Sequence, residues 1–186
     1  MGEHSGTHIS SPATFRAGAA GPHDLQPEQL VVPAAVVDVS VRASEDPDYV
    51  LDRRDIESWE QEWGRIPQGA LVLLRTGWHR YWDEPHRFIN VDSSGVMHTP
   101  GFAPNAARDL LLERGASGLG TDAPGVDAGV DTSFEVSRLV LEQHRLVLEC
   151  LNNLDQLPPA GSTIVVGRLS LVGGSGSPAS VLALTP

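Results

Sequence analysis

An α/β fold is predicted for this chain of 186 residues, because short buried strands alternate with helices along the sequence. Residues 30–41 form a nearly unbroken apolar run rich in valine, which is typical of a strand buried on both faces. Residues 53–65 place Ile56, Trp59 and Trp63 along one stripe of an amphipathic helix. The composition, with 40% hydrophobic and 20% charged residues, is that of an ordinary globular protein.

The rest of the chain continues this alternation. Residues 1–29 are rich in Gly, Ala, Pro and His and are expected to form loops. Neither a repeat nor a long linker divides the sequence, so we expect one domain over residues 1–186. Further strands are expected at residues 70–76, 116–121, 146–151, 162–171 and 180–184, and further helices at residues 104–114 and 132–144.

The composition also excludes several classes of function. All 13 basic residues are arginine, and 24 acidic residues bring the net charge to −11, which argues against a nucleic-acid partner. A chain without lysine has neither a Schiff-base residue nor a Walker-type phosphate loop. Its one cysteine, Cys150, excludes an internal disulfide. Residues 30–37 are too short an apolar stretch to span a bilayer, and no signal peptide precedes them, so we expect a cytoplasmic protein without a membrane partner.

The densest cluster of polar residues lies at the N-terminus, where His4 and His8 are separated by Gly6. On an extended segment, positions 4, 6, 8 and 10 share one face, so the two imidazoles can converge on a metal ion. Taken alone, the pair fits a solvated N-terminus with two incidental histidines at least as well.

Residues 4–15 read His-Ser-Gly-Thr-His-Ile-Ser-Ser-Pro-Ala-Thr-Phe. This segment closely resembles the signature His-x-Gly-Thr-His-x-Asp-x-Pro-x-His of the metal-dependent cyclase family, which includes bacterial kynurenine formamidases and isatin hydrolases. The resemblance implies a swivelling β/β/α fold with a mixed sheet core, assembled as a homodimer or higher homo-oligomer. Further segments resemble the family in the same order, at residues 32–38, 74–78, 120–124, 153–158 and 173–176.

The resemblance also implies a site. It assigns a divalent zinc or manganese ion to His4, His8 and Glu149, with Ser10 and Ser137 in place of an aspartate and a histidine that are ligands elsewhere in the family. Because a hydroxyl is a poor ligand for zinc, a weak site for one metal ion is expected.

The residue expected to transfer protons also differs from that of the family. Thr14 stands where the family has its catalytic histidine, and a threonine hydroxyl is no general base at neutral pH. Glu149, or a histidine such as His23 or His144, would then accept protons, or metal-bound hydroxide would act alone.

Three hypotheses about function follow from the resemblance. The first is an arylformamidase-like hydrolase that cleaves a C–N or C–O bond of a small molecule with metal-activated water, with Trp78 or Trp82 in the pocket wall. The second is a non-hydrolytic member, a small-molecule cyclase, dehydratase or binding protein that has lost its metal. The third is a fragment that folds only with upstream residues or a partner chain.

The start of the chain supports the third hypothesis, because family members carry several tens of residues before the signature. We therefore expect this chain to lack the family's N-terminal segment, through a misassigned start codon or a natural truncation. Such a truncation would leave an unpaired sheet edge along residues 30–37 and 71–74, which a second copy would cover. A chain extended upstream in frame is expected to be more stable.

Overall fold

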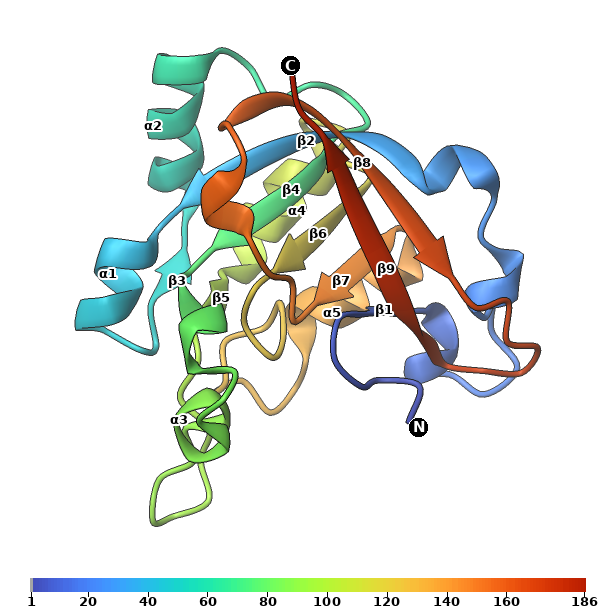
Figure 1. Cartoon of the computed structure of the whole chain (residues 1–186), viewed down its shortest axis with the longest axis horizontal. Helices are drawn as coiled ribbons and strands as arrows, with labels where there is room; N and C mark the ends of the chain where they lie inside the picture. Colours follow the sequence, from blue (N-terminus) through green and yellow to red (C-terminus); the bar gives the residue numbers. More distant parts are fainter. Residues whose placement is uncertain (1) are drawn as a thin grey trace.

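Seven strands close into a barrel in the computed structural model, which describes residues 2–186 (Figure 1). Around the barrel the order is β1-β7-β6-β4-β2-β8-β9, and pairing of β9 with β1 closes the ring. Two further strands, β3 and β5, form a small separate sheet. The strands are β1 His8–Ser10, β2 Val31–Asp38, β3 Val50–Leu51, β4 Leu71–Arg75, β5 Gly101–Phe102, β6 Gly118–Thr121, β7 Leu146–Glu149, β8 Ala160–Arg168 and β9 Gly176–Leu184.

The helices lie between these strands in the chain. Asp52 caps α2 by accepting hydrogen bonds from the backbone of Arg54 and Asp55. Pro104 occupies the first turn of α4, where its missing N–H costs nothing. Within residues 2–186 the α-helices are α1 Ser40–Glu45, α2 Arg53–Trp63, α3 Pro85–Ile89, α4 Pro104–Leu112 and α5 Glu135–Glu142. Short 3₁₀ turns lie at Pro12–Thr14, Pro22–Asp24, Pro27–Gln29, Trp78–Tyr81 and Leu154–Gln156.

The barrel mixes parallel and antiparallel strands. β2, β4, β6 and β7 run parallel to one another, whereas β1, β8 and β9 pair antiparallel. Helices follow the parallel strands, as crossover connections require. The predicted α/β fold with a mixed sheet core is therefore confirmed.

Successive side chains of the parallel strands point to opposite faces of the sheet and so form two hydrophobic cores. In β4, Leu71 and Leu73 point into the barrel, while Val72 and Leu74 face the layer of helices outside it. The outer core joins these strands to α2, α4 and α5, with Trp59 of α2 donating its indole N–H to the carbonyl of Val36 at 2.8 Å. Both faces of the central strands are thus covered, which explains their nearly unbroken apolar sequence.

Three expectations about these elements are wrong. Residues 30–37 and 71–74 form no free edge, because β2 and β4 have hydrogen-bonded neighbours on both sides in the closed barrel. Residues 1–29 are not loop throughout, since β1 lies within them. Trp63, placed on the buried stripe of α2, is 47% exposed because the helix ends there and Gly64 turns the chain away.

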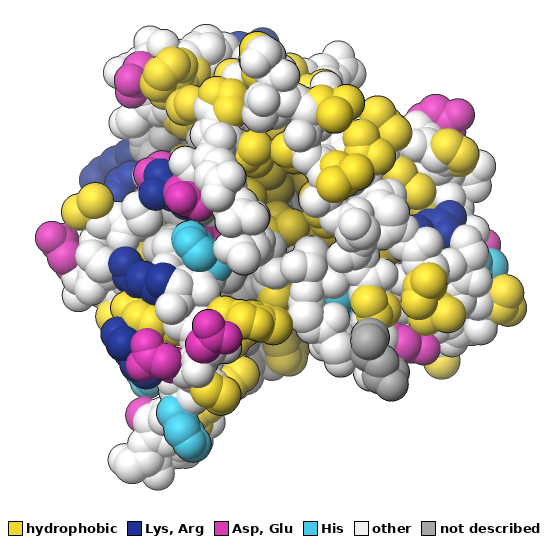
Figure 2. All heavy atoms as spheres, in the orientation of Figure 1, with side chains coloured by type: hydrophobic (Ala, Val, Ile, Leu, Met, Phe, Trp, Pro, Cys, Tyr) yellow, Lys and Arg dark blue, Asp and Glu magenta, His cyan; other side chains and the backbone are white. Residues whose placement is uncertain are grey.

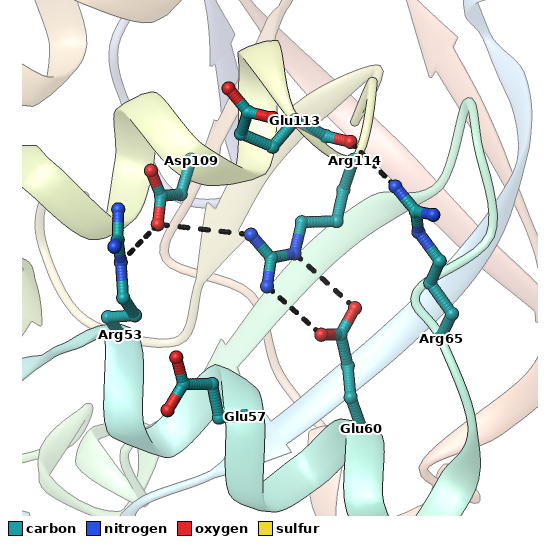
Figure 3. A pocket seen from close by; sticks show the side chains of 7 residues that line it. All are labelled: Arg53, Glu57, Glu60, Arg65, Asp109, Glu113 and Arg114. Atoms are coloured by element: carbon teal, nitrogen blue, oxygen red, sulfur yellow. Dashed lines mark hydrogen bonds and ion pairs between the residues drawn. The ribbon is translucent and has the colours of Figure 1, made fainter.

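A cluster of ion pairs joins α2 to the end of α4 (Figure 3). Arg114 lies at its centre, with Nη2 3.0 Å from Oε2 of Glu60 and Nη1 3.8 Å from Oδ2 of Asp109. Arg53 contacts the same oxygen of Asp109, and Arg65 donates to the carbonyl of Glu113. In the hollow of about 710 Å³ between these side chains, the charges of Arg53 and Arg114 are therefore already paired.

A second hollow opens at one end of the barrel, where Figure 2 shows hydrophobic side chains between the 3₁₀ turn Leu154–Gln156 and β9. Its volume is about 450 Å³, and Leu73, Leu151, Ile164 and Val181 are among its lining residues. The lining has no titratable side chain, so this hollow is an exposed part of the inner core and holds no acid-base chemistry.

An arm extends from the body of the protein between β4 and β5 (Figure 1). It contains α3 and a loop, residues 91–97, closed by an isolated bridge between Val91 and Met97. Residues 95–97 of this loop line the cavity beside the functional site described below. No helix in the described part of the chain is long and apolar enough to cross a membrane.

Candidate metal centre

His8 and Glu149 meet because β1 and β7 are neighbouring antiparallel strands in which these two residues lie opposite each other. Nε2 of His8 lies 2.8 Å from Oε2 of Glu149, with the two side chains 6% and 13% exposed. Cross-strand partners on one face of a sheet have adjacent side chains, so the register alone brings these two residues together.

His4 completes the cluster from the turn before β1. Its ring lies edge-on to that of His8, with 5.1 Å between the centroids. Ser10, two residues after His8 on the same face of β1, has its Oγ 3.3 Å from Nδ1 of His4 and 3.3 Å from Oε2 of Glu149. The convergence of His4 and His8 expected from the extended pattern is therefore present.

These side chains fit a divalent metal ion. One ligand atom from each of His4, His8 and Glu149 lies within 4.8 Å of the others. Zinc bonds of roughly 2.0–2.2 Å in a tetrahedral arrangement separate neighbouring ligand atoms by about 3.3 Å, so small movements suffice. Two imidazoles and a carboxylate form a known catalytic zinc set that leaves one position for water.

Hydrogen bonding prepares His8 for this role. Its Nδ1 lies 2.9 Å from the carbonyl oxygen of Gly6, which only accepts hydrogen bonds, so Nδ1 carries the proton and Nε2 faces Glu149. Burial lowers the pKa of His8, but its hydrogen bonds with Cys150 and Glu149 outweigh burial and raise the pKa to about 10. Burial and the charge of His8 lower the pKa of His4, against the opposing effect of Glu149 and Glu3.

A cavity of about 720 Å³ opens beside the cluster. Phe15 and Phe134 form an aromatic pair in its wall, with ring centroids 6.0 Å apart. Residues 95–97, on the returning side of the loop in the arm, contribute Val96 and Met97. The complete lining is His4, His8, Ser10, Thr14, Phe15, Gly95, Val96, Met97, Thr99, Pro124, Gly125, Asp127, Ala128, Gly129, Val130, Asp131, Thr132, Phe134, Ser137, Leu141 and Glu149.

Ser137 lines this cavity but is bonded elsewhere. Its hydroxyl donates a short hydrogen bond to Asp127, which also accepts from the backbone N–H groups of Val136 and Ser137 at the start of α5. Burial raises the pKa of Asp127, although these hydrogen bonds act in the other direction. The structure therefore brings Ser10, and not Ser137, into contact with the His4, His8 and Glu149 cluster.

The structure shows which of the residues considered for proton transfer lie near the cluster. The hydroxyl of Thr14 lines the cavity but donates to the carbonyl of Ser175 at 2.9 Å. Neither His23 nor His144 is in the cavity lining, and Nε2 of His23 lies 3.5 Å from Asp24. Of the proposed groups, only Glu149 lies at the cluster.

The expectation that Trp78 or Trp82 lines this pocket is wrong. Trp78 is buried in a separate small core and donates its indole N–H to the carbonyl of Phe88. Trp82 borders a different cavity of about 230 Å³, together with His79 and Cys150. The aromatic wall is formed by Phe15 and Phe134, which lie far apart in the sequence and share no common pattern.

Asp127 is a cavity residue that was not predicted from the sequence. A signal was present: it follows the Gly-Thr-Asp-Ala-Pro segment, residues 120–124, and precedes α5 by eight residues. An acidic residue in that place is a reasonable partner for the unpaired N–H groups at the start of a helix.

An α/β barrel with two histidines and a carboxylate beside a cavity defines a metal-dependent enzyme. The chain belongs to the cyclase family, whose model, "Putative cyclase", matches residues 1–128.

Relatives within this family are hydrolases. The chain is 36% identical to an isatin hydrolase from Roseibium aggregatum, over 100% of the chain and 73% of that protein. It is 28% identical to a kynurenine formamidase from Salinibacter ruber, over 96% of the chain and 74% of that protein. The structure of isatin hydrolase A from Labrenzia aggregata bound to benzyl benzoate superposes with a TM-score of 0.92 at 36% identity, covering 100% of this chain and 74% of the other. The resemblance stated from the sequence is confirmed.

Proposed function

We propose that this protein is a metal-dependent hydrolase that cleaves the C–N or C–O bond of a small neutral aryl amide, lactam, lactone or ester. The observation that carries the proposal is the cluster of His4, His8 and Glu149 at the wall of a cavity large enough for a small molecule. The hydrolase relatives named above support the same chemistry.

His4 and His8 would bind the metal ion, each through one ring nitrogen. A divalent zinc or manganese ion, when bound, lowers the pKa of water and polarises the carbonyl of the substrate. His8 offers Nε2 to the ion and is held in this tautomer by Gly6. His4 offers Nδ1, the ring nitrogen that faces Ser10 and the cluster.

Glu149 has a second role. Its Oε2 faces His8 and Ser10, whereas no hydrogen bond from another described residue reaches Oε1, which lies toward Gly125. This oxygen is free to accept a proton from the attacking water and pass it to the leaving group. Glu149 thereby takes over the role for which Thr14 is unsuited.

The cavity lining selects the substrate by charge. Its walls combine Phe15, Phe134 and Met97 with the acidic side chains of Asp127 and Asp131, and no arginine is in the described lining. Away from the metal ion, which the reacting carbonyl would occupy, a substrate carboxylate would be desolvated there without an arginine partner, which is costly. A neutral aromatic compound therefore fits better than an amino acid.

The test uses metal-free chain reloaded with Zn²⁺ or Mn²⁺ and offered two substrates, isatin and an aryl formamide that carries a free amino acid group. We expect hydrolysis of isatin, at least about tenfold better kcat/KM than for the charged formamide, and loss of activity in His8→Ala. Metal-loaded chain without activity on either compound would overturn the hydrolase proposal. Preference for the charged formamide would overturn the substrate class.

We also propose a homodimer or higher homo-oligomer. Leu182 and Leu184 of β9 are each 62% exposed, and Val172 in the turn before β9 is exposed as well. Exposed apolar side chains grouped on one strand favour association. Sedimentation that shows only monomer at micromolar concentration would contradict this proposal.

A further inference from the structure

The turn that leads into β9 contributes a serine to the candidate metal centre. Oγ of Ser175 lies 2.9 Å from Nε2 of His4, on the opposite side of the ring from the cluster. The same Oγ lies 2.9 Å from Oε2 of Glu3, which also accepts from the backbone N–H of Ser175 at 2.7 Å and of Gly176 at 3.4 Å. Residues 171 or more positions apart in the chain are thus joined in one relay.

The order of donors in this relay is fixed by chemistry. The Glu3 carboxylate only accepts hydrogen bonds, so the single O–H of Ser175 donates to it. The serine oxygen is then left as an acceptor for the N–H at Nε2 of His4. Ser10 offers His4 the mirror arrangement, because its O–H donates to Glu149 and its oxygen could accept from Nδ1, but both of these contacts are 3.3 Å long, whereas those of Ser175 are 2.9 Å. A neutral imidazole has one N–H, so the shorter contacts place it at Nε2 and leave the lone pair on Nδ1, which faces Ser10.

The backbone supports the same placement of the ring. A Cβ atom on Gly176 would lie 2.5 Å from Cε1 and 2.8 Å from Nε2 of His4, so the imidazole packs directly against a residue without a side chain. Ser11 and Thr14 both donate to the carbonyl oxygen of Ser175, which holds the turn against the start of the chain.

We propose that Ser175, oriented by Glu3, is a positioning residue that fixes His4 in the tautomer and orientation that present Nδ1 to the metal ion. The proposal rests on the proposed metal-dependent function of this site. Outer partners of metal-bound histidines set their tautomer and raise their basicity, and losing such a partner typically lowers metal affinity by about 10–100-fold. His4 needs such a partner because it is exposed and lies in a turn, whereas His8 is buried in β1.

The first experiment measures Zn²⁺ affinity of the full chain by competition with a chelator. We expect Ser175→Ala to bind Zn²⁺ about 10–100-fold more weakly, and Ser175→Thr, which keeps the hydroxyl, to bind as wild type does. Ser11→Ala is the matched control: it removes a hydrogen bond to the carbonyl of the same residue and leaves the relay intact. If Ser175→Ala and Ser11→Ala lower the affinity equally, the hydroxyl acts only by holding the turn, and the proposal is overturned.

The second experiment needs no metal. Long-range ¹H–¹⁵N spectra of histidine-labelled, metal-free chain at pH 8 report which ring nitrogen of His4 carries the proton. We expect the Nε2–H form in wild type and a shift toward Nδ1–H in Ser175→Ala; an Nδ1–H form in wild type overturns the relay. A wild-type chain that binds no Zn²⁺ but has His4 as Nε2–H would remove the proposed function and leave the relay standing, so the two failures are distinguishable.

Discussion

Oε2 of Glu149 lies 2.8 Å from Nε2 of His8, on the strand directly opposite. Nδ1 of His8 is occupied by its hydrogen bond to Gly6, so Nε2 is the nitrogen that holds either a proton or a metal ion. Without metal, a proton between the two side chains stabilises the pair, and under the proposed function the metal ion would take the place of that proton. Glu149 is therefore the group on which both states depend.

Replacing Glu149 by glutamine tests this dependence. Glu149→Gln keeps the size of the side chain but removes the only anionic ligand of the cluster, so Zn²⁺ affinity is expected to fall by more than about 100-fold, beyond the range of outer-partner effects. Ser10→Ala and Ser137→Ala serve as comparisons, because neither removes a charge. Chelator competition measures all three, and equal losses in the three variants would contradict the assignment of Glu149 as the main ligand.

Rebuilding the ligand set of the family should tighten the site. Oγ of Ser10 already lies 3.3 Å from both His4 and Glu149, so an aspartate there would reach the ion. A histidine at position 137 would find a partner for its second nitrogen in Asp127. The double variant Ser10→Asp with Ser137→His is expected to bind Zn²⁺ at least about tenfold more tightly, since carboxylate and imidazole are stronger ligands than hydroxyl.

Thermal melting provides a control for this variant. Without metal, the new carboxylate beside Glu149 repels it, so the melting temperature should be lower than in wild type. With excess Zn²⁺ the order should reverse, because binding to the folded state adds stability that grows with affinity. A variant whose melting temperature does not respond to Zn²⁺ would refute the design.

The sequence predicted the local structure better than the site. Apolar runs and alternation identified β2, β4 and the helices α2 and α4, because burial on both faces or on one stripe leaves a local pattern. Strand periodicity accounts for His8 and Ser10, which share one face of β1, but not for His4, which reaches them from the turn before the strand.

The remaining site residues and the closure of the barrel depend on how strands distant in the sequence pair with one another. Glu149 was assigned only through the family resemblance, since pairing of β1 with β7, which brings Glu149 to Ser10 from 139 positions along the chain, leaves no local trace. Ser175 lies in residues 173–176, a segment that resembles the family, but nothing in the sequence assigned a role to this serine. The unpaired edge expected along β2 was wrong for the same reason: closure of the barrel by β8, β9 and β1 is a long-range property.

The ion pairs between α2 and α4 offer a test of stability away from the site. Arg114 and Glu60 are 15% and 19% exposed, and their contact raises the pKa of Arg114. Removing one partner leaves the other partly buried without its counter-charge, so Arg114→Met or Glu60→Gln is expected to lower the free energy of unfolding by about 1–3 kcal/mol. The double variant should lose less free energy of unfolding than the two single variants together, as measured by urea denaturation. Strict additivity would show that the pair contributes nothing.

The arm beside the cavity is expected to respond to pH through His98. Its Nδ1 lies 2.8 Å from Oδ2 of Asp48, and its Nε2 lies 3.6 Å from Oδ2 of Asp92, in the loop whose returning side, residues 95–97, lines the cavity. Hydrogen bonding to Asp48 is the main cause that raises the pKa of His98 above its usual value of 6.5, against the opposing effect of desolvation.

A raised pKa means that the folded chain binds this proton more tightly than the unfolded chain does. The resulting stabilisation is complete below pH 6.5 and is lost as the pH rises through the folded-state pKa of His98. The difference in melting temperature between wild type and His98→Gln should therefore be largest at about pH 5.5 and shrink toward about pH 8.5. NMR titration of His98 is the direct measurement, with Asp48→Asn expected to return its pKa toward 6.5. If Asp48→Asn leaves the pKa of His98 unchanged, Asp48 is not the group that raises this pKa, and the prediction fails.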